Sequence, residues 1–179
     1  MRTIMPNMII GQIFGIIATL VTFFSYQANT KRRILIIQTF ACIFTCIGYF
    51  FLEARSGLVL NIVCIVRNIA FYFQKEGTKA SYLSAVLFAG IMIVLGAISW
   101  QGLLSLLIII ALAANTVFLS LGKPQLLRKS ILITSSMVLI YNVFVFSIGG
   151  IANEALAIIS SIIGLVRFYK NNKKYNDSI

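Results

Sequence analysis

The chain has 179 residues, of which 60% are hydrophobic and 11% are charged, whereas a soluble domain carries about 25% charged residues. This composition excludes an ordinary water-soluble globular protein. Lys and Arg (15) outnumber Asp and Glu (4), which gives a formal net charge of +11. On a soluble chain this charge would suggest binding to nucleic acid, but the bases lie between long apolar segments, so we expect no nucleic-acid partner.

The apolar segments have lengths close to the roughly 20 residues that an α-helix needs to cross a bilayer. They do not alternate apolar and polar residues, as the strands of a membrane barrel would. The uncharged run 80–122 is too long for one span and is expected to turn near Trp100, because tryptophan is enriched at membrane interfaces. Seven spanning helices are predicted, at about 8–27, 34–52, 58–74, 82–99, 103–122, 131–149 and 154–169.

The bases are divided unequally between the two sets of loops that seven spans define. One set contains only Arg2 and Arg55. Because loops rich in Lys and Arg stay on the cytoplasmic side, the N-terminus is predicted outside and the C-terminus in the cytoplasm. The bases of the other set are Lys31, Arg32, Arg33, Lys75, Lys79, Lys123, Arg128, Lys129, Lys170, Lys173 and Lys174.

The order of charges and loops in the first three spans recurs in the last three. Residues 31–36 (KRRILI) resemble residues 128–133 (RKSILI). A single linker helix would keep two three-helix bundles parallel, a plan that recurs in transporters with a site near the membrane midplane. The alternative is chance similarity among apolar helices. The predicted fold is an all-α integral membrane protein in a 3+1+3 arrangement, with a first repeat at 1–79, a linker at 80–102 and a second repeat with a basic tail at 103–179.

Short motifs in the first, third and seventh spans carry a family resemblance. They are Gly11-Gln12-Ile13-Phe14-Gly15, Tyr26-Gln27, Leu60-Asn61, Arg67, Glu154 and Val166-Arg167-Phe168-Tyr169. In their order and spacing the chain resembles the YgjV-type family of bacterial inner membrane proteins, and it is more remotely similar to SWEET, PQ-loop and PnuC-type (MtN3-like) transporters. The first resemblance implies a multi-pass protein of the bacterial plasma (inner) membrane. The second implies passage of a small polar solute, such as a sugar or a nucleoside-like compound.

The PQ-loop resemblance also implies hinges. These proteins have Pro-Gln near the end of the first helix of each three-helix bundle, where a helix break acts as a hinge. Pro124 and Gln125 match this motif in the second half, and Tyr26 and Gln27 stand at the first position. Only the second predicted hinge therefore has a proline.

Polar residues inside the spans are the candidates for solute binding, because an ionisable group in a membrane is costly. Arg67 is about 12 Å along a helix from Lys75, farther than comfortable snorkelling. The alternative is that Arg67 reaches headgroups or pins helix ends through backbone carbonyls, and that the other polar groups bond helix to helix. The predicted solute-binding set is Asn61, Arg67, Asn68, Asn142 and Ser161.

Glu154 is the acidic residue at the outer end of the last span. It is a possible coupling carboxylate, and the alternative is a solvated group in a loop.

The chain has no His, no pair of carboxylates within one span and no glycine-rich nucleotide loop, so we expect no enzymatic activity, metal or cofactor. The first functional hypothesis is a small alternating-access transporter or facilitator for a small polar solute. The alternative is a non-transporting scaffold or subunit that binds partner membrane proteins. The expected partners are the lipid bilayer and a small polar solute, and the homo-oligomeric state stays open.

Overall fold

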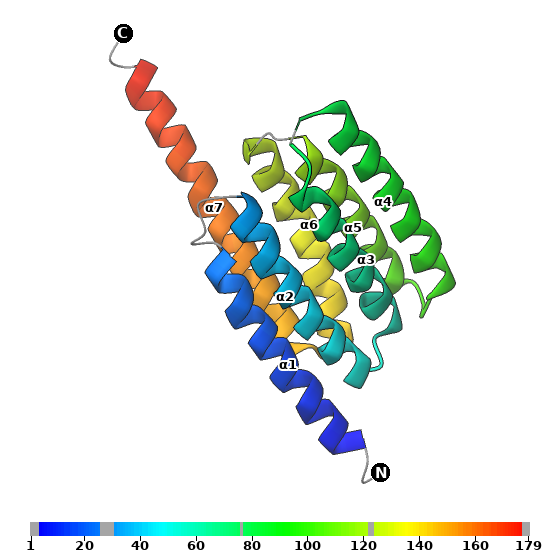
Figure 1. The fold of residues 1–179 in the computed structure, drawn as a ribbon. Coiled ribbons are helices and arrows are strands. Elements are labelled where there is room, and N and C mark those ends of the chain that lie inside the picture. Colours follow the sequence, from blue (N-terminus) through cyan, green and yellow to red (C-terminus); the bar gives the residue numbers. More distant parts are fainter. Residues whose placement is uncertain (1–3, 26–30, 76, 122–123, 177–179) are drawn as a thin grey trace.

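The computed structural model describes residues 4–25, 31–75, 77–121 and 124–176, which form α-helices and no strand (Figure 1). Six of these helices are long and apolar enough to cross a membrane, and α5 is apolar but only 17 residues long. The prediction of an all-helical membrane protein is thereby confirmed. The seven helices are α1 (Ile4–Ser25), α2 (Lys31–Phe51), α3 (Arg55–Tyr72), α4 (Lys79–Ile98), α5 (Leu104–Ser120), α6 (Pro124–Phe144) and α7 (Ile148–Asn176).

The predicted boundaries are wrong for the last two helices. The sixth span was expected to run to residue 149, but α6 ends at Phe144 and α7 begins at Ile148. Between them Phe146 has a φ of 54°, a left-handed conformation that is uncommon for a residue other than glycine. The turn consists of Val, Phe and Ser, so hydropathy gives no sign of it.

The α2–α3 and α6–α7 turns have the same backbone geometry. In the first, Glu53 has a φ of 56° and the following amide donates to the carbonyl of Tyr49 (2.9 Å). In the second, Phe146 has a φ of 54° and the following amide donates to the carbonyl of Asn142 (2.9 Å). Tyr49 and Asn142 are 93 residues apart, and Glu53 and Phe146 have the same separation.

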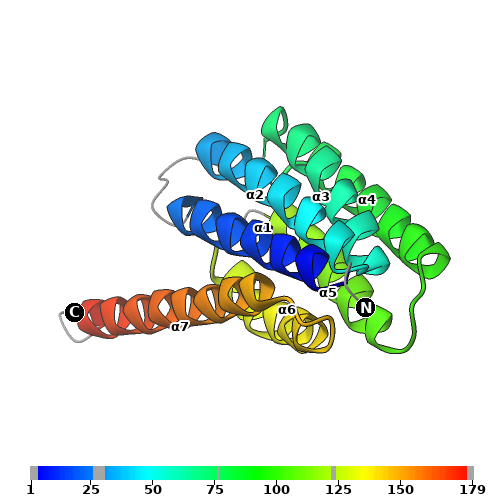
Figure 2. The same cartoon turned by 90° about the horizontal axis from the view of Figure 1, so that it is seen from below.

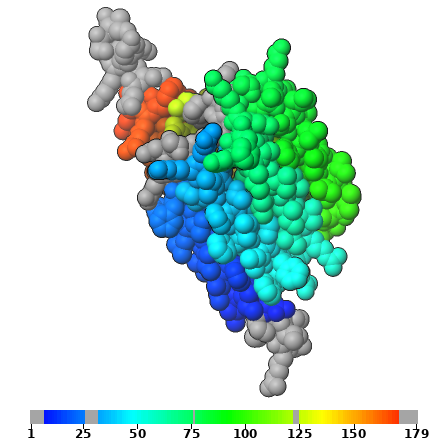
Figure 3. Space-filling view, viewed as in Figure 1, coloured from blue at the N-terminus to red at the C-terminus, as the bar shows by residue number. Residues whose placement is uncertain are grey.

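The helices are arranged so that segments far apart in the chain lie side by side. α1 packs against α2 and α7, α3 packs against α2, α4 and α5, and α6 packs against α5 and α7. α4 lies at one edge of the molecule, away from α1 and α7 (Figures 1 and 2). Figure 3 shows α2, α3 and α4 side by side on one face. Large apolar side chains of α2 and α4 are exposed, including Ile36, Phe40, Leu83 and Leu87, as expected of a surface in contact with lipid.

The two ends of the bundle differ in charge. One end, which we call the basic end, carries Arg32, Arg33, Lys75, Lys79 and Lys170 at or near the ends of α2, α3, α4 and α7. The other, which we call the turn end, contains the beginning of α1 and the turns 52–54, 99–103 and 145–147.

Glycines allow α1, α2 and α7 to approach one another closely. A Cβ atom on Gly48 of α2 would lie 3.1 Å from the carbonyl oxygen of Gly11 of α1. A Cβ on Gly149 of α7 would overlap the backbone of Gly15 and lie 2.5 Å from the amide nitrogen of Ile16. Only a residue without a side chain fits at Gly149, whereas a methyl group at Gly48 would require its neighbour to move by a few tenths of an ångström. Both crossings agree with the role of small residues between membrane helices.

Candidate functional site

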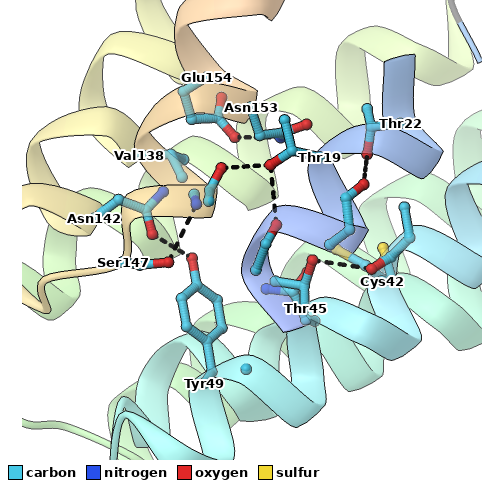
Figure 4. A pocket seen from close by; sticks show the side chains of 18 of the residues that line it. Thr19, Thr22, Cys42, Thr45, Tyr49, Val138, Asn142, Ser147, Asn153 and Glu154 are labelled. Atoms are coloured by element: carbon cyan, nitrogen blue, oxygen red, sulfur yellow. Dashed lines mark hydrogen bonds between the residues drawn. The ribbon is translucent and has the colours of Figure 1, made fainter. Parts of the chain in front are cut away.

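A polar cavity of about 190 Å³ lies between the helices (Figure 4). Its described lining comes from α1, α2, α3, α5, α6 and α7, and no described residue of α4 contributes. The volume is roughly that of six water molecules at about 30 Å³ each. The polar residues of the lining are Thr19, Thr22, Gln38, Thr45, Tyr49, Asn61, Arg67, Asn68, Asn115, Asn142, Ser147, Asn153 and Glu154.

Small and polar residues on α1 and α2 face this cavity because they recur every three or four positions, which places them on one side of a helix. The hydroxyl of Thr22 donates to the carbonyl of Ala18, and the hydroxyl of Thr45 donates to that of Ala41 (both 2.9 Å). These hydroxyl protons are satisfied within their own helices, so the oxygens remain available as acceptors. The aligned lining residues are Gly15, Ala18, Thr19 and Thr22 on α1, and Gln38, Ala41, Cys42, Thr45, Gly48 and Tyr49 on α2.

Arg67 on α3 is only 5% exposed and lines the cavity. Its Nη1 donates to the Thr116 hydroxyl on α5 (2.8 Å), and its Nη2 and Nε donate to Asn68 Oδ1 (2.8 and 3.2 Å). Both partners are neutral. A buried guanidinium is therefore held in the cavity wall by hydrogen bonds that do not compensate its charge.

Hydrogen bonds at the turn end join the earlier helices to the later ones. The Tyr49 hydroxyl of α2 donates to Asn142 Oδ1 of α6 (2.6 Å), as Figure 4 shows. The Tyr141 hydroxyl accepts from the backbone amide of Gly57 of α3 (3.0 Å). The rings of Tyr49 and Tyr141 pack edge to face, with centroids 6.1 Å apart. These contacts tie α2 and α3 to α6 beside the cavity.

Tyr49→Phe is expected to lower the free energy of unfolding by about 1–3 kcal/mol, because Asn142 Oδ1 would lose its donor in a buried position. Tyr49 and Asn142 are both buried but line the cavity, so water inside the cavity can replace part of the lost bond and the expected effect lies toward the lower end of this range. The thermal unfolding midpoint of the detergent-purified protein measures the effect. Tyr82→Phe is the matched control, since Tyr82 of α4 is 52% exposed. Equal midpoints for the two variants would show that the Tyr49 hydrogen bond does not stabilise the fold.

Glu154 lies within α7, because that helix begins earlier than predicted. It lines the cavity, and its carboxylate accepts from Asn153 Nδ2 (3.1 Å). Figure 4 shows Glu154 and Asn153 together at one side of the cavity, near Thr19. The carboxylate is thus part of the cavity wall rather than of a loop, and its role in coupling stays a prediction.

Of the predicted solute-binding residues, Asn61, Arg67, Asn68 and Asn142 line the cavity. Ser161 is buried in α7 but does not belong to the described lining. Prediction missed the threonines of α1 and α2, Tyr49 and Asn153. The signal that identifies most of them is the three- and four-residue spacing of small and polar residues along each helix.

The structure does not test the two predicted hinges. Tyr26 and Gln27 lie outside the described residues. Pro124 is the first residue of α6, a position where proline does not interrupt helical hydrogen bonds. Gln125 Oε1 accepts from Arg128 Nη1 (3.4 Å). A hinge at either position stays a prediction.

Comparison with known proteins identifies the family. The Imp-YgjV family model, described as a bacterial inner membrane protein, matches residues 9–172. No curated protein and no solved structure matches the chain. The chain therefore belongs to the Imp-YgjV family of bacterial inner membrane proteins, and its helices make it a multi-pass membrane protein. The predicted resemblance to the YgjV-type family is confirmed, and the more remote similarity to SWEET, PQ-loop and PnuC-type transporters stays a prediction.

Proposed function

We propose that this member of the Imp-YgjV family is a small carrier or facilitator, and not an enzyme, that moves a small polar solute across the inner membrane. The observation that carries the proposal is that Asn61, Arg67 and Asn142, which come from different parts of the chain, line one polar cavity. A scaffold that used its helices only for packing would have no need of a hollow lined by an arginine, a glutamate and several amides. The remote resemblance to SWEET and PQ-loop transporters, which is a prediction from the sequence motifs, would agree with this function.

The proposed architecture is two three-helix units, α1–α3 and α5–α7, joined by α4. The α2–α3 and α6–α7 turns support it, because their backbone geometry recurs after 93 residues. The helix contacts support it too. When α1, α2 and α3 are matched in order with α5, α6 and α7, the contact of α1 with α7 corresponds to the contact of α5 with α3. Tyr49 and Asn142 are then equivalent positions that bond to each other across the boundary between the units.

The proposed orientation has the basic end in the cytoplasm and the turn end outside, because Lys and Arg accumulate on the cytoplasmic side. In alternating access the solute site opens to one side at a time as the two units rock. The bonds from Tyr49 to Asn142 and from Gly57 to Tyr141 join the units at the turn end. We propose that they form an outer gate, which must break when the cavity opens to the outside.

Uptake into proteoliposomes tests the proposed function. The purified full chain is reconstituted and assayed with labelled sugars, nucleosides and amino acids, and at least one class is expected to accumulate faster than in protein-free vesicles. Thr45→Phe, which places a ring in the cavity wall, should abolish that flux. Ile43→Phe on the same helix is the matched control, since Ile43 is exposed and is not part of the described lining.

A different outcome of the same experiment would favour the scaffold alternative. If the folded protein moves none of these solutes but copurifies with a stable membrane-protein partner, the scaffold alternative replaces the carrier.

A further inference from the structure

Several buried polar atoms of residues that line the cavity have no hydrogen-bond partner within the part of the chain that the structure describes. They are Asn68 Nδ2, Asn115 Oδ1 and Asn153 Oδ1, and all three residues line the cavity. Buried polar atoms are usually bonded. Because these atoms are themselves buried, a ligand in the cavity would supply the missing partners only after the amide groups turn toward it. One of the atoms is a donor and two are acceptors, so the ligand must both accept and donate hydrogen bonds.

The hydrogen bonds around these asparagines determine which amide atom is free. Arg67 donates twice to Asn68 Oδ1, which leaves Asn68 Nδ2 as the free donor. Asn153 Nδ2 donates to Glu154, which leaves Asn153 Oδ1 as the free acceptor. A free donor therefore lies beside the positively charged Arg67, and a free acceptor lies beside the negatively charged Glu154.

The two charges are not neutralised by their bonded partners. Among the described residues, Arg67 donates to the oxygens of Asn68 and Thr116 alone. A guanidinium has five N–H groups, so two remain for a ligand. Glu154 accepts from Asn153, which is neutral. The cavity wall therefore has a positive donor cluster, Arg67 and Asn68 on α3, and a negative acceptor cluster, Asn153 and Glu154 on α7.

The two clusters lie at different distances along their helices. At 1.5 Å per residue, Arg67 is about 18 Å and Glu154 about 9 Å from the turn-end starts of their helices. α3 and α7 both run from the turn end to the basic end, so Arg67 lies roughly 9 Å farther along its own helix than Glu154 does. Both side chains are long enough to shorten such a gap. A cavity of about 190 Å³ accommodates a solute of the size of a small amino acid.

We propose that the cavity binds a small zwitterion, whose carboxylate contacts Arg67 and Asn68 and whose ammonium group contacts Glu154 and Asn153. A neutral sugar would leave both charges uncompensated, and a simple anion or cation would compensate only one. This inference rests on the proposed function and names the class of solute.

Thermal stabilisation of the detergent-purified full chain tests the inference without requiring transport. The zwitterionic probes are glycine, β-alanine and γ-aminobutyrate, which differ in charge separation. The single-charge probes are propionate and propylamine, and the neutral probes are glucose and uridine. At least one zwitterion is expected to stabilise the protein at a concentration about tenfold lower than any single-charge or neutral probe, which corresponds to one added ionic contact.

Two substitutions separate recognition from structure. Glu154→Gln should abolish the preference for the zwitterion over propionate, and Arg67→Gln should abolish its preference over propylamine. A merely structural role for either residue would change the response to all probes alike and would overturn the assignment of that residue.

Stabilisation by glucose or uridine and by no zwitterion would overturn the inference, while uptake of those solutes would leave the proposed function intact. Conversely, binding of a zwitterion without flux of any solute would retain the site and overturn the carrier.

Discussion

Gly149→Ala should destabilise the protein by about 3 kcal/mol or more, the upper part of the range for overpacking a buried contact. The added methyl group would overlap the backbone of Gly15 and lie 2.5 Å from the Ile16 nitrogen. A flexible side chain can rotate away from such a contact, but the backbone of a helix cannot. α1 and α7 would have to separate, and the bond from the Thr19 hydroxyl to the Gly149 carbonyl (2.6 Å) would then be lost.

The thermal unfolding midpoint in detergent and the size-exclusion profile measure this effect. Gly90→Ala in α4 is the matched control, because no atom lies within 4 Å of a Cβ added there. Its stability should stay the same or rise by up to about 1 kcal/mol, since alanine is favoured over glycine inside a helix. If the two variants unfold at the same temperature, the close crossing of α1 and α7 is not present in the folded protein.

Hydropathy alone predicts most of the helices, because a membrane span must be long and apolar. It fails where a turn is itself apolar, as at Val145 and Phe146 between α6 and α7. The repeat illustrates a second limit. The basic motifs beginning at Lys31 and Arg128 differ by 97 positions, whereas the turns differ by 93. The two offsets differ by about one helical turn. Residues one turn apart lie on the same side of a helix, so a comparison of the two sequence motifs can match them one turn out of register.

The candidate site was predictable where a single residue is unusual in a membrane. Arg67 stands out because it is charged, and Asn61 and Asn142 stand out because they are amides within apolar helices. Thr45 and Tyr49 do not stand out individually, since threonine can bond to its own helix and tyrosine is common at interfaces. The Tyr49 hydroxyl of α2 bonds to Asn142 of α6, 93 residues away in the chain, and a sequence pattern does not specify this contact.

Arg67→Met should reduce solute uptake by about 100-fold but leave stability within about 1 kcal/mol of the wild type. A charge-assisted hydrogen bond contributes about 1.5–3 kcal/mol. Because about 1.4 kcal/mol corresponds to a tenfold change in the dissociation constant, the upper part of this range corresponds to about 100-fold. Removing the guanidinium also removes a burial cost of about 2.5–3.5 kcal/mol in a membrane. This gain offsets the lost bonds to Asn68, and Thr116 keeps its bond to the Leu112 carbonyl (2.7 Å).

Uptake per folded molecule and the unfolding midpoint, measured on the same preparation, distinguish the two roles of Arg67. If the arginine serves only to hold α3 against α5, Arg67→Met will lower the midpoint and leave uptake per folded molecule unchanged. Arg167→Met is the matched control, because Arg167 on α7 is exposed and is not part of the described cavity lining. It removes a positive charge from the same chain and should change neither quantity. Loss of uptake in both variants would attribute the effect to the overall charge of the protein rather than to the cavity.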